Sequence, residues 1–216
     1  MKRFLIVFAF FLGACNTART TDRLLAEVWK NDQAVRYQMM ELTRAVTTEG
    51  RADLIDSLIT VSETVERVDA ENMVIVENVL KGGLPANLTP ESYKTIWIVI
   101  DHQSLENQEK YLPLIEQMAL DGRIGADEYA TLFDRVAMKN ERPQRFGTQS
   151  IQFGEFDNMS LCLWPVESPE KVDSLRTTVG LSPLADYLRQ LTTAMGIEAR
   201  FDPEMTIEEL NVLRYE

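Results

Sequence analysis

Residues 22–47 read DRLLAEVWKNDQAVRYQMMELTRAVT, and their apolar side chains recur with a helical spacing that constrains the rest of the chain. These side chains lie three, four or seven positions apart, at Leu25, Val28, Val35, Met39, Leu42 and Val46. An α-helix places positions with this spacing on one face, which packs against another element. Thr21 or Asp22 is a suitable N-cap, and Gly50 is a suitable stop. We therefore predict an amphipathic helix over residues 22–47.

A second stretch with the same period follows directly. Its apolar stripe comprises Leu58, Val61, Val65, Val68, Ile75 and Val79. The polar Asn72 takes the remaining place on that stripe. Gly82 and Gly83 end the run, and Pro85 blocks its continuation. Two amphipathic helices joined by a short turn predict an antiparallel hairpin, whose second helix spans residues 52–81.

Three further helices are predicted after the hairpin. Residues 89–91 read Thr-Pro-Glu, which is the order of N-cap, proline and acid that begins a helix. The run that they open ends near Asp101 and is apolar nearly all round, so we expect a central buried helix. Residues 105–120 and 125–139 follow as amphipathic helices.

The period then changes from helical to alternating. Residues 150–153 and 159–164 alternate apolar and polar side chains around a Gly-containing loop, which predicts a β-hairpin near residues 148–165. A short helix near residues 168–170 and a last helix over residues 182–195 complete the pattern.

These elements predict a mainly α fold, a helical bundle-like domain with one small β-hairpin. We expect a single domain over residues 22–196, because this length can bury one substantial core. Residues 197–216 are a C-terminal extension that no pattern places.

The first residues resemble a bacterial lipoprotein signal. Lys2 and Arg3 precede an unbroken apolar run, which ends in Leu-Gly-Ala-Cys at residues 12–15. A positive start, a short apolar core and small residues before a cut site are typical of a secretory signal. The last four residues resemble the lipobox, whose cysteine receives lipid. We expect residues 1–14 to be a signal peptide, and residues 15–21 to be the lipidated Cys15 with a short tether.

The lipid bilayer is therefore an expected partner, bound through acyl chains on Cys15, because two or three such chains give stable anchoring. The apolar run is roughly half as long as a membrane-spanning helix requires. In the sorting rule of many Gram-negative bacteria, Asp after the cysteine retains the protein at the inner membrane. Asn16 stands there in this chain. We expect the bacterial cell envelope as the location, with the outer membrane favoured over the inner membrane.

The composition is strongly acidic, with a net charge of −12. Removal of residues 1–14 takes away the two positive charges of Lys2 and Arg3, so the net charge becomes −14. Such a domain does not carry the positive footprint of a nucleic-acid-binding protein, and we expect no nucleic-acid partner. Cys15 and Cys162 are the two cysteines. If Cys15 carries lipid, Cys162 has no partner for a disulfide and is expected to be buried.

Six short segments of the chain form an ordered set. They are Asp69–Asn72, Gly83–Pro85, Ile100–Gln103, Leu132–Val136, Arg145–Gln149, and Val172–Arg176 leading to Gly180 and Leu181. Their order and spacing, over about residues 25–190, resemble the domain of unknown function 6624. The chain departs from that pattern at Leu84, where the family often has Trp, and at Asp101, where it often has Gln. The family has no established activity, so the resemblance implies a fold unit and a candidate site but no reaction.

Polar residues of these segments are the ligand-binding candidates: Asp69, Asn72, His102, Gln103, Asp134, Arg135, Arg145, Gly147, Gln149 and Arg176. Arginine offers a planar fork for a carboxylate or a phosphate, and glycine lets the backbone approach a ligand closely. The alternative is a buried polar network that fixes the hairpin against the helices.

His102 is the single histidine of the chain and the first catalytic candidate, with Asp134 as the second. A histidine titrates near neutral pH and can act as a general acid or base. The alternative is a histidine that is hydrogen-bonded at the C-terminus of its helix, where the helix dipole favours a cation.

We expect no metal and no cofactor. Zinc sites usually use two or three His or Cys ligands. A hard-cation site built from carboxylates stays an alternative, but the chain has neither an EF-hand loop nor a phosphate-binding loop. A nucleophilic pair of Cys162 and His102 is conceivable, but Cys162 lies within an alternating strand.

The expected function is that of a membrane-anchored envelope lipoprotein that acts as a binding module rather than as an enzyme. Its partner would be another envelope protein or a small anionic ligand. The alternative is an envelope hydrolase with His102 as general acid or base beside Asp134 or Asp101. In that case Arg135, Arg145 or Arg176 would bind an anionic substrate.

Overall fold

A computed structural model describes residues 5–154 and 159–215, and it describes the side chains of residues 18–47, 49–154 and 159–213. Contacts within the chain divide it into two compact units, Met1–Gln103 and Ser104–Glu216. The expectation of a single domain over residues 22–196 stays a prediction. The loop of residues 154–158 falls largely outside the described part, as does the side chain of Cys15.

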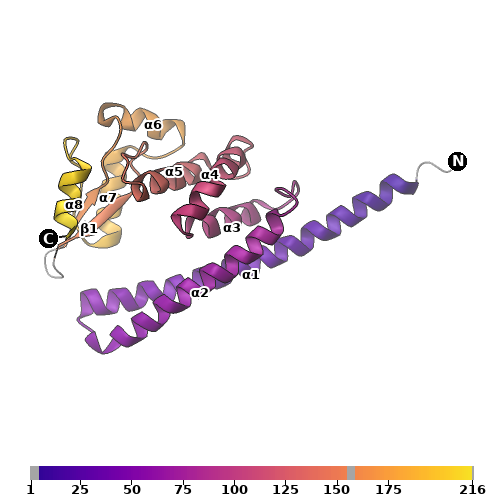
Figure 1. Cartoon of the computed structure of the whole chain (residues 1–216), viewed down its shortest axis with the longest axis horizontal. Helices are drawn as coiled ribbons and strands as arrows, with labels where there is room; N and C mark the ends of the chain where they lie inside the picture. The colour runs from indigo at the N-terminus through magenta and orange to yellow at the C-terminus, as the bar shows by residue number, and fades with distance from the viewer. Residues whose placement is uncertain (1–4, 155–158, 216) are drawn as a thin grey trace. The chain divides into compact units, whose positions relative to one another are not determined.

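The first unit is built on the predicted helical hairpin, which is confirmed (Figure 1). Helix α1 (Leu5–Glu49) lies beside helix α2 (Ile55–Leu80), and the short 3₁₀ helix η1 (Ala52–Leu54) joins them. Gly50 ends α1 with a φ of 68°, a left-handed conformation that a glycine adopts without strain. The face between the helices buries Leu25 and Val28 of α1 and Val61, Val65, Val68, Met73 and Val76 of α2.

The predicted start of the first helix is wrong. Helix α1 begins at Leu5 and continues through residues 16–21, because that stretch contains no Gly or Pro to interrupt it. Asp22 lies inside α1 and caps a different helix. Its Oδ1 accepts hydrogen bonds from the Thr89 amide at 3.0 Å and from the Ser92 hydroxyl at 2.7 Å.

Helix α3 (Pro90–Asp101) begins as the sequence predicts, because the Thr89 side chain accepts from the Ser92 amide at 3.2 Å. Eight of its side chains are buried, among them the large apolar residues Tyr93, Ile96, Trp97, Val99 and Ile100. Helix α3 contacts both α1 and α2. The expectation of a central buried helix is therefore confirmed. The C-terminal end of α3 lies beside α1 and α2.

The second unit contains five helices and a small sheet among its described residues. The helices are α4 (Leu105–Leu120), α5 (Ala126–Lys139), α6 (Val172–Thr178), α7 (Leu184–Met195) and α8 (Ile207–Tyr215), with the 3₁₀ helix η2 (Pro169–Lys171) before α6. Strands β1 (Ser150–Phe153) and β2 (Ser160–Leu163) pair antiparallel, with Ser150 opposite Leu163. The mainly α class and the predicted β-hairpin are both confirmed.

Residues 197–216, which no sequence pattern places, contribute to this unit. Strand β3 (Ala199–Arg200) pairs in parallel with β2, which gives the sheet the order β1-β2-β3. From α8, Leu210 is completely buried against Cys162 and Trp164. The expectation that Cys162 is buried is thus confirmed. Among the described residues, no helix combines the length and the apolar character needed to cross a membrane.

Candidate functional site

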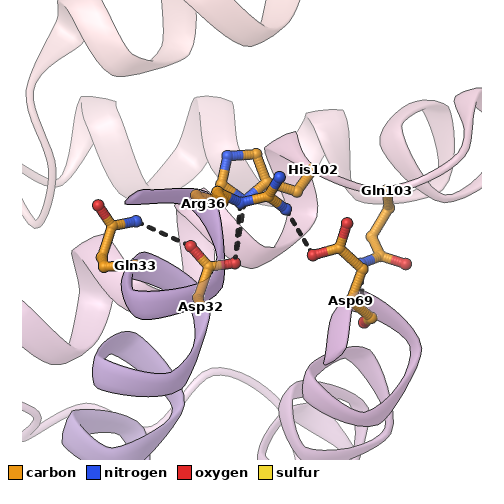
Figure 2. Close-up of polar contacts among 6 residues, drawn as sticks. All are labelled: Asp32, Gln33, Arg36, Asp69, His102 and Gln103. Atoms are coloured by element: carbon orange, nitrogen blue, oxygen red, sulfur yellow. Dashed lines mark hydrogen bonds and ion pairs between the residues drawn. The ribbon is translucent and has the colours of Figure 1, made fainter. Parts of the chain in front are cut away.

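Polar side chains from all three helices of the first unit meet at one place (Figure 2). They are Asp32 and Arg36 on α1, Asp69 on α2, and His102 and Gln103 at the C-terminal end of α3. We call these five residues the three-helix cluster. His102 is the C-cap of α3, so the helix end itself directs the imidazole toward α1.

Asp32 is the buried centre of the cluster, with an exposed fraction of 0%. Its Oδ1 lies 3.1 Å from His102 Nδ1 and accepts a hydrogen bond from Arg36 Nε at 3.3 Å. Its Oδ2 accepts from Gln33 Nε2 at 2.8 Å. Burial raises the pKa of Asp32, but the hydrogen bond and the charge of His102 and the charge of Arg36 outweigh that effect and lower the pKa below its usual range. Asp32 is therefore ionised at neutral pH.

Arg36 connects the two carboxylates of the cluster. Its Nη2 lies 2.5 Å from Asp69 Oδ1, while its Nε faces Asp32. The side chains of Arg36 and Asp69 are 22% and 18% exposed, so this pair lies at the edge of the cluster. Burial raises the pKa of Asp69 above its usual range, and the charge of Arg36 opposes the rise. Gln103 Nε2 donates to the main-chain oxygen of Asp69 at 3.1 Å and so ties α3 to α2.

His102 presents one ring nitrogen to Asp32 and leaves the other available. Its side chain is 17% exposed, and among the described residues its Nε2 has no hydrogen-bond partner. A proton on Nδ1, donated to Asp32, would leave a lone pair on Nε2 that can accept a proton or bind a ligand. His102 is thus hydrogen-bonded at the C-terminal end of its helix and also has an available ring nitrogen, while its role as a general acid or base stays a prediction.

Asn72 adds an unsatisfied polar group on the same face of α2. The residue is 4% exposed, and its buried Nδ2 has no hydrogen-bond partner among the described residues. Glu49 and Ile55 flank the hairpin turn, and Arg36 pairs with Asp69. This antiparallel register places Asn72 near the level of Asp32. A buried amide without a partner costs free energy, so a missing acceptor is expected at that level of the hairpin.

Three side chains of the cluster have the chemistry of metal ligands. Asp32, Asp69 and His102 each offer one ligand atom, and these three atoms lie within 4.8 Å of one another. The sequence argues against a metal by counting His and Cys ligands, whereas the fold brings two carboxylates to the one imidazole.

The candidates in the second unit serve a different purpose. Asp134 is 0% exposed, and its carboxylate accepts the amide hydrogens of Arg145 at 2.8 Å, Phe146 at 3.1 Å and Thr148 at 3.0 Å. The Thr148 hydroxyl donates to it as well, at 2.9 Å. Burial raises the pKa of Asp134, and the three amides oppose that rise. Asp134 thus holds the turn of residues 145–148 in place.

Arg176 completes the same network and is 1% exposed. Its Nη1 donates to the main-chain oxygens of Phe146 and Gly147, both at 2.8 Å, and its Nε donates to Ser182 O at 2.6 Å. Gly147 has a φ of 67°, a left-handed conformation that residues with a side chain rarely adopt. These contacts support the alternative of a buried polar network for this set of residues.

The remaining candidates of the second unit also have protein partners. Gln149 is 7% exposed and donates through Nε2 to the Thr131 main-chain oxygen at 3.3 Å. Arg145 lies 3.3 Å from Glu167 and stacks over the ring of Phe133. Arg135 is half-buried and interacts within the protein as well.

Sequence reasoning missed Asp32 and Arg36. Asp32 interrupts the apolar stripe of α1, four positions after Val28 and three before Val35. A charged residue on a buried stripe is costly, and that position was the available signal. Arg36 carries no such signal, because an arginine one helical turn from an aspartate is common on exposed faces.

Comparison with protein families assigns the chain. Residues 20–200 match the Family of unknown function (DUF6624). The chain belongs to this family. The resemblance seen in the sequence is thereby confirmed, and the matched range includes the three-helix cluster. Comparison with curated proteins and with solved structures produced no significant match.

The lowered pKa of Asp32 predicts a pH-dependent contribution to stability. At pH 7, Asp32→Asn should lower the free energy of unfolding by about 2 kcal/mol, because Arg36 and His102 lose a buried anionic partner. The wild-type advantage is complete above the unfolded-state pKa of about 3.9 and disappears as the pH falls through the lower folded-state value. Urea denaturation between pH 7 and pH 3 measures this, with the exposed Asp56→Asn as control. A difference that stays constant into acid would contradict it.

Asp134→Asn should destabilise the protein by about 3 kcal/mol, because an amide nitrogen would face main-chain N–H groups that require an acceptor. Thermal and urea unfolding measure the effect. The exposed Glu170→Gln in the same unit should change stability by less than about 0.5 kcal/mol. Equal stability of the two variants would show that the carboxylate is not needed to hold the turn.

Proposed function

We propose that this protein is a lipid-anchored component of the bacterial cell envelope whose first unit binds a small ligand at the three-helix cluster. One observation carries the binding site: the buried, ionised Asp32 orients His102, whose Nε2 has no partner among the described residues. An oriented imidazole with an available nitrogen is a ready ligand-binding group.

The anchor rests on the sequence that ends in Cys15. Helix α1 runs without interruption from this region to Glu49. Asp32 is seventeen residues beyond Cys15, which corresponds to about 25 Å along a continuous helix. A cluster at that distance from the acylated residue is consistent with a binding site held near, but not in, the lipid surface.

The charge of the cluster favours a cationic ligand over the anionic ligand that the sequence predicts. Two carboxylates, Asp32 and Asp69, face one guanidinium. Arg176, one of the three arginines that the sequence offers for an anion, donates to main-chain oxygens instead. A negative ligand would therefore meet more repulsion than attraction at the cluster.

A hydrolase remains the second candidate, because Asp32 and His102 have the arrangement of a carboxylate that orients a general base. In this version Asp32 takes the role that the sequence assigned to Asp134 or Asp101. The remaining catalytic requirement is a nucleophile, for which a water molecule would serve.

The anchor predicts that Cys15→Ser abolishes lipid attachment. The wild-type protein, expressed in a Gram-negative host with labelled palmitate, should carry the label and sediment with membranes. Cys15→Ser should carry no label. Label that persists in the variant, or wild-type protein that never incorporates it, would overturn the proposed anchor.

The binding site predicts a non-covalent adduct that depends on His102. The mature full-length protein, extracted in mild detergent, should show this adduct by native mass spectrometry. His102→Gln should lose it, whereas Glu71→Gln, an exposed acid on α2, should keep it. Identical spectra for all three proteins would overturn the proposal. Hydrolysis of p-nitrophenyl acetate or p-nitrophenyl phosphate that disappears in His102→Gln would establish the second candidate instead.

A further inference from the structure

We infer that the three-helix cluster binds a divalent transition-metal ion through Asp32, Asp69 and His102, with Arg36 as the cation that the metal displaces. This inference rests on the proposed function and names the ligand class of that site. Three features of the cluster support a metal: the spacing of the ligand atoms, the position of Arg36 and the unsatisfied amide of Asn72.

The ligand atoms already have a separation that suits a metal. Asp32 Oδ1 and His102 Nδ1 lie 3.1 Å apart. Two ligands bonded at about 2.1 Å to one metal are separated by about 3.0–3.4 Å in octahedral or tetrahedral geometry. A ligand atom of Asp69 lies within 4.8 Å of both, a gap that side-chain rotation closes. Metal binding would move the imidazole proton from Nδ1 to Nε2, so the metal takes Nδ1, and the Nε2–H stays available to donate to a second ligand.

The ligand types select the class of metal. Two carboxylates and one imidazole form a mixed oxygen and nitrogen set, which suits Zn²⁺, Mn²⁺ or Fe²⁺. Ca²⁺ and Mg²⁺ prefer ligand sets made of oxygen alone. Three protein ligands also leave at least one coordination position for water or a second ligand, as in metal sites that bind substrates.

Arg36 is the cation that lies between the two carboxylates of the cluster. Its Nε faces Asp32 at 3.3 Å and its Nη2 faces Asp69 at 2.5 Å. The arginine side chain is 22% exposed, so it lies at the edge of the cluster and can rotate toward solvent. A divalent ion would replace its single charge with two and would balance both carboxylates.

Asn72 provides the independent indication of a ligand. Its buried Nδ2 lacks an acceptor among the described residues, and the hairpin register places Asn72 near the level of Asp32. A water molecule bound to a metal at Asp32 would offer a lone pair to a donor at this level. The metal would then supply an acceptor for an amide that has none among the described residues.

Isothermal titration calorimetry of the mature full-length protein, after removal of metals with EDTA, tests the inference with ZnCl₂ and MnCl₂ as probes. We expect one ion per chain. Asp32→Asn and His102→Gln should each weaken binding by at least 100-fold, because each removes one of three ligands. Arg36→Gln should bind at least as tightly as the wild type, because the competing cation is gone. The exposed Glu71→Gln should bind like the wild type.

The Arg36 variant separates this site from a structural salt-bridge network. In a network without a metal role, Arg36→Gln would only destabilise the protein and would leave no ion binding to measure. Urea denaturation of each variant identifies loss of folding, and His102→Ala serves as a second test if His102→Gln unfolds. The absence of saturable binding to the wild type, or binding that is unchanged in Asp32→Asn and His102→Gln, would overturn the inference.

The two proposals fail in distinguishable ways. A His102-dependent adduct that is organic, together with no metal binding, would overturn the metal inference and leave the proposed binding site intact. No His102-dependent adduct of any kind, together with no metal binding, would overturn both.

Discussion

The burial of Asp32 is the constraint on which the first unit depends. An ionised carboxylate without contact with solvent costs several kcal/mol unless opposite charges and hydrogen-bond donors surround it. Its partners come from two helices, Arg36 on α1 and His102 at the end of α3, and Arg36 continues to Asp69 on α2. All three helices must therefore adopt one mutual arrangement before this charge is satisfied. The apolar faces drive their association, while the charged cluster selects the register in which they associate.

Most helices could be predicted because their signals are local. The limits of α4 at Leu105 and Leu120 follow from period and capping, and Thr89 begins α3 through a contact within its own first turn. The start of α1 could not be predicted in this way. Asp22 has the appearance of an N-cap, but its carboxylate accepts hydrogen bonds from Thr89 and Ser92, about 70 positions later in the chain. Only the packing of α3 on α1 reveals which helix that carboxylate caps.

Only part of the candidate site could be predicted from the sequence. His102, Gln103 and Asp69 stand in the segments that carry the resemblance to the family, whereas Asp32 and Arg36 stand in none of those segments. The sequence leaves carboxylate ligands open as an alternative, but it does not show which aspartates of other helices lie beside the single histidine. The sequence also could not separate polar residues that bind a ligand from those that bind the protein's own backbone. Arg176 looks like an anion-binding residue until the main-chain oxygens of Phe146 and Gly147 are seen beside it.

The contrast between Asp32 and Asp134 is the strongest reason to look for function in the first unit. Both aspartates are completely buried. Asp134 accepts from main-chain amides that require an acceptor, so removal of the carboxylate would leave several unsatisfied donors. These hydrogen bonds fully explain why Asp134 is buried. Asp32 lies on a stripe where an apolar side chain would pack between α1 and α2, and its charge obliges the fold to bury further charge around it. Replacement of such charged groups by apolar residues is often neutral or stabilising, so packing alone does not account for them. A charged cluster that apolar packing alone does not require is the feature expected of a binding site.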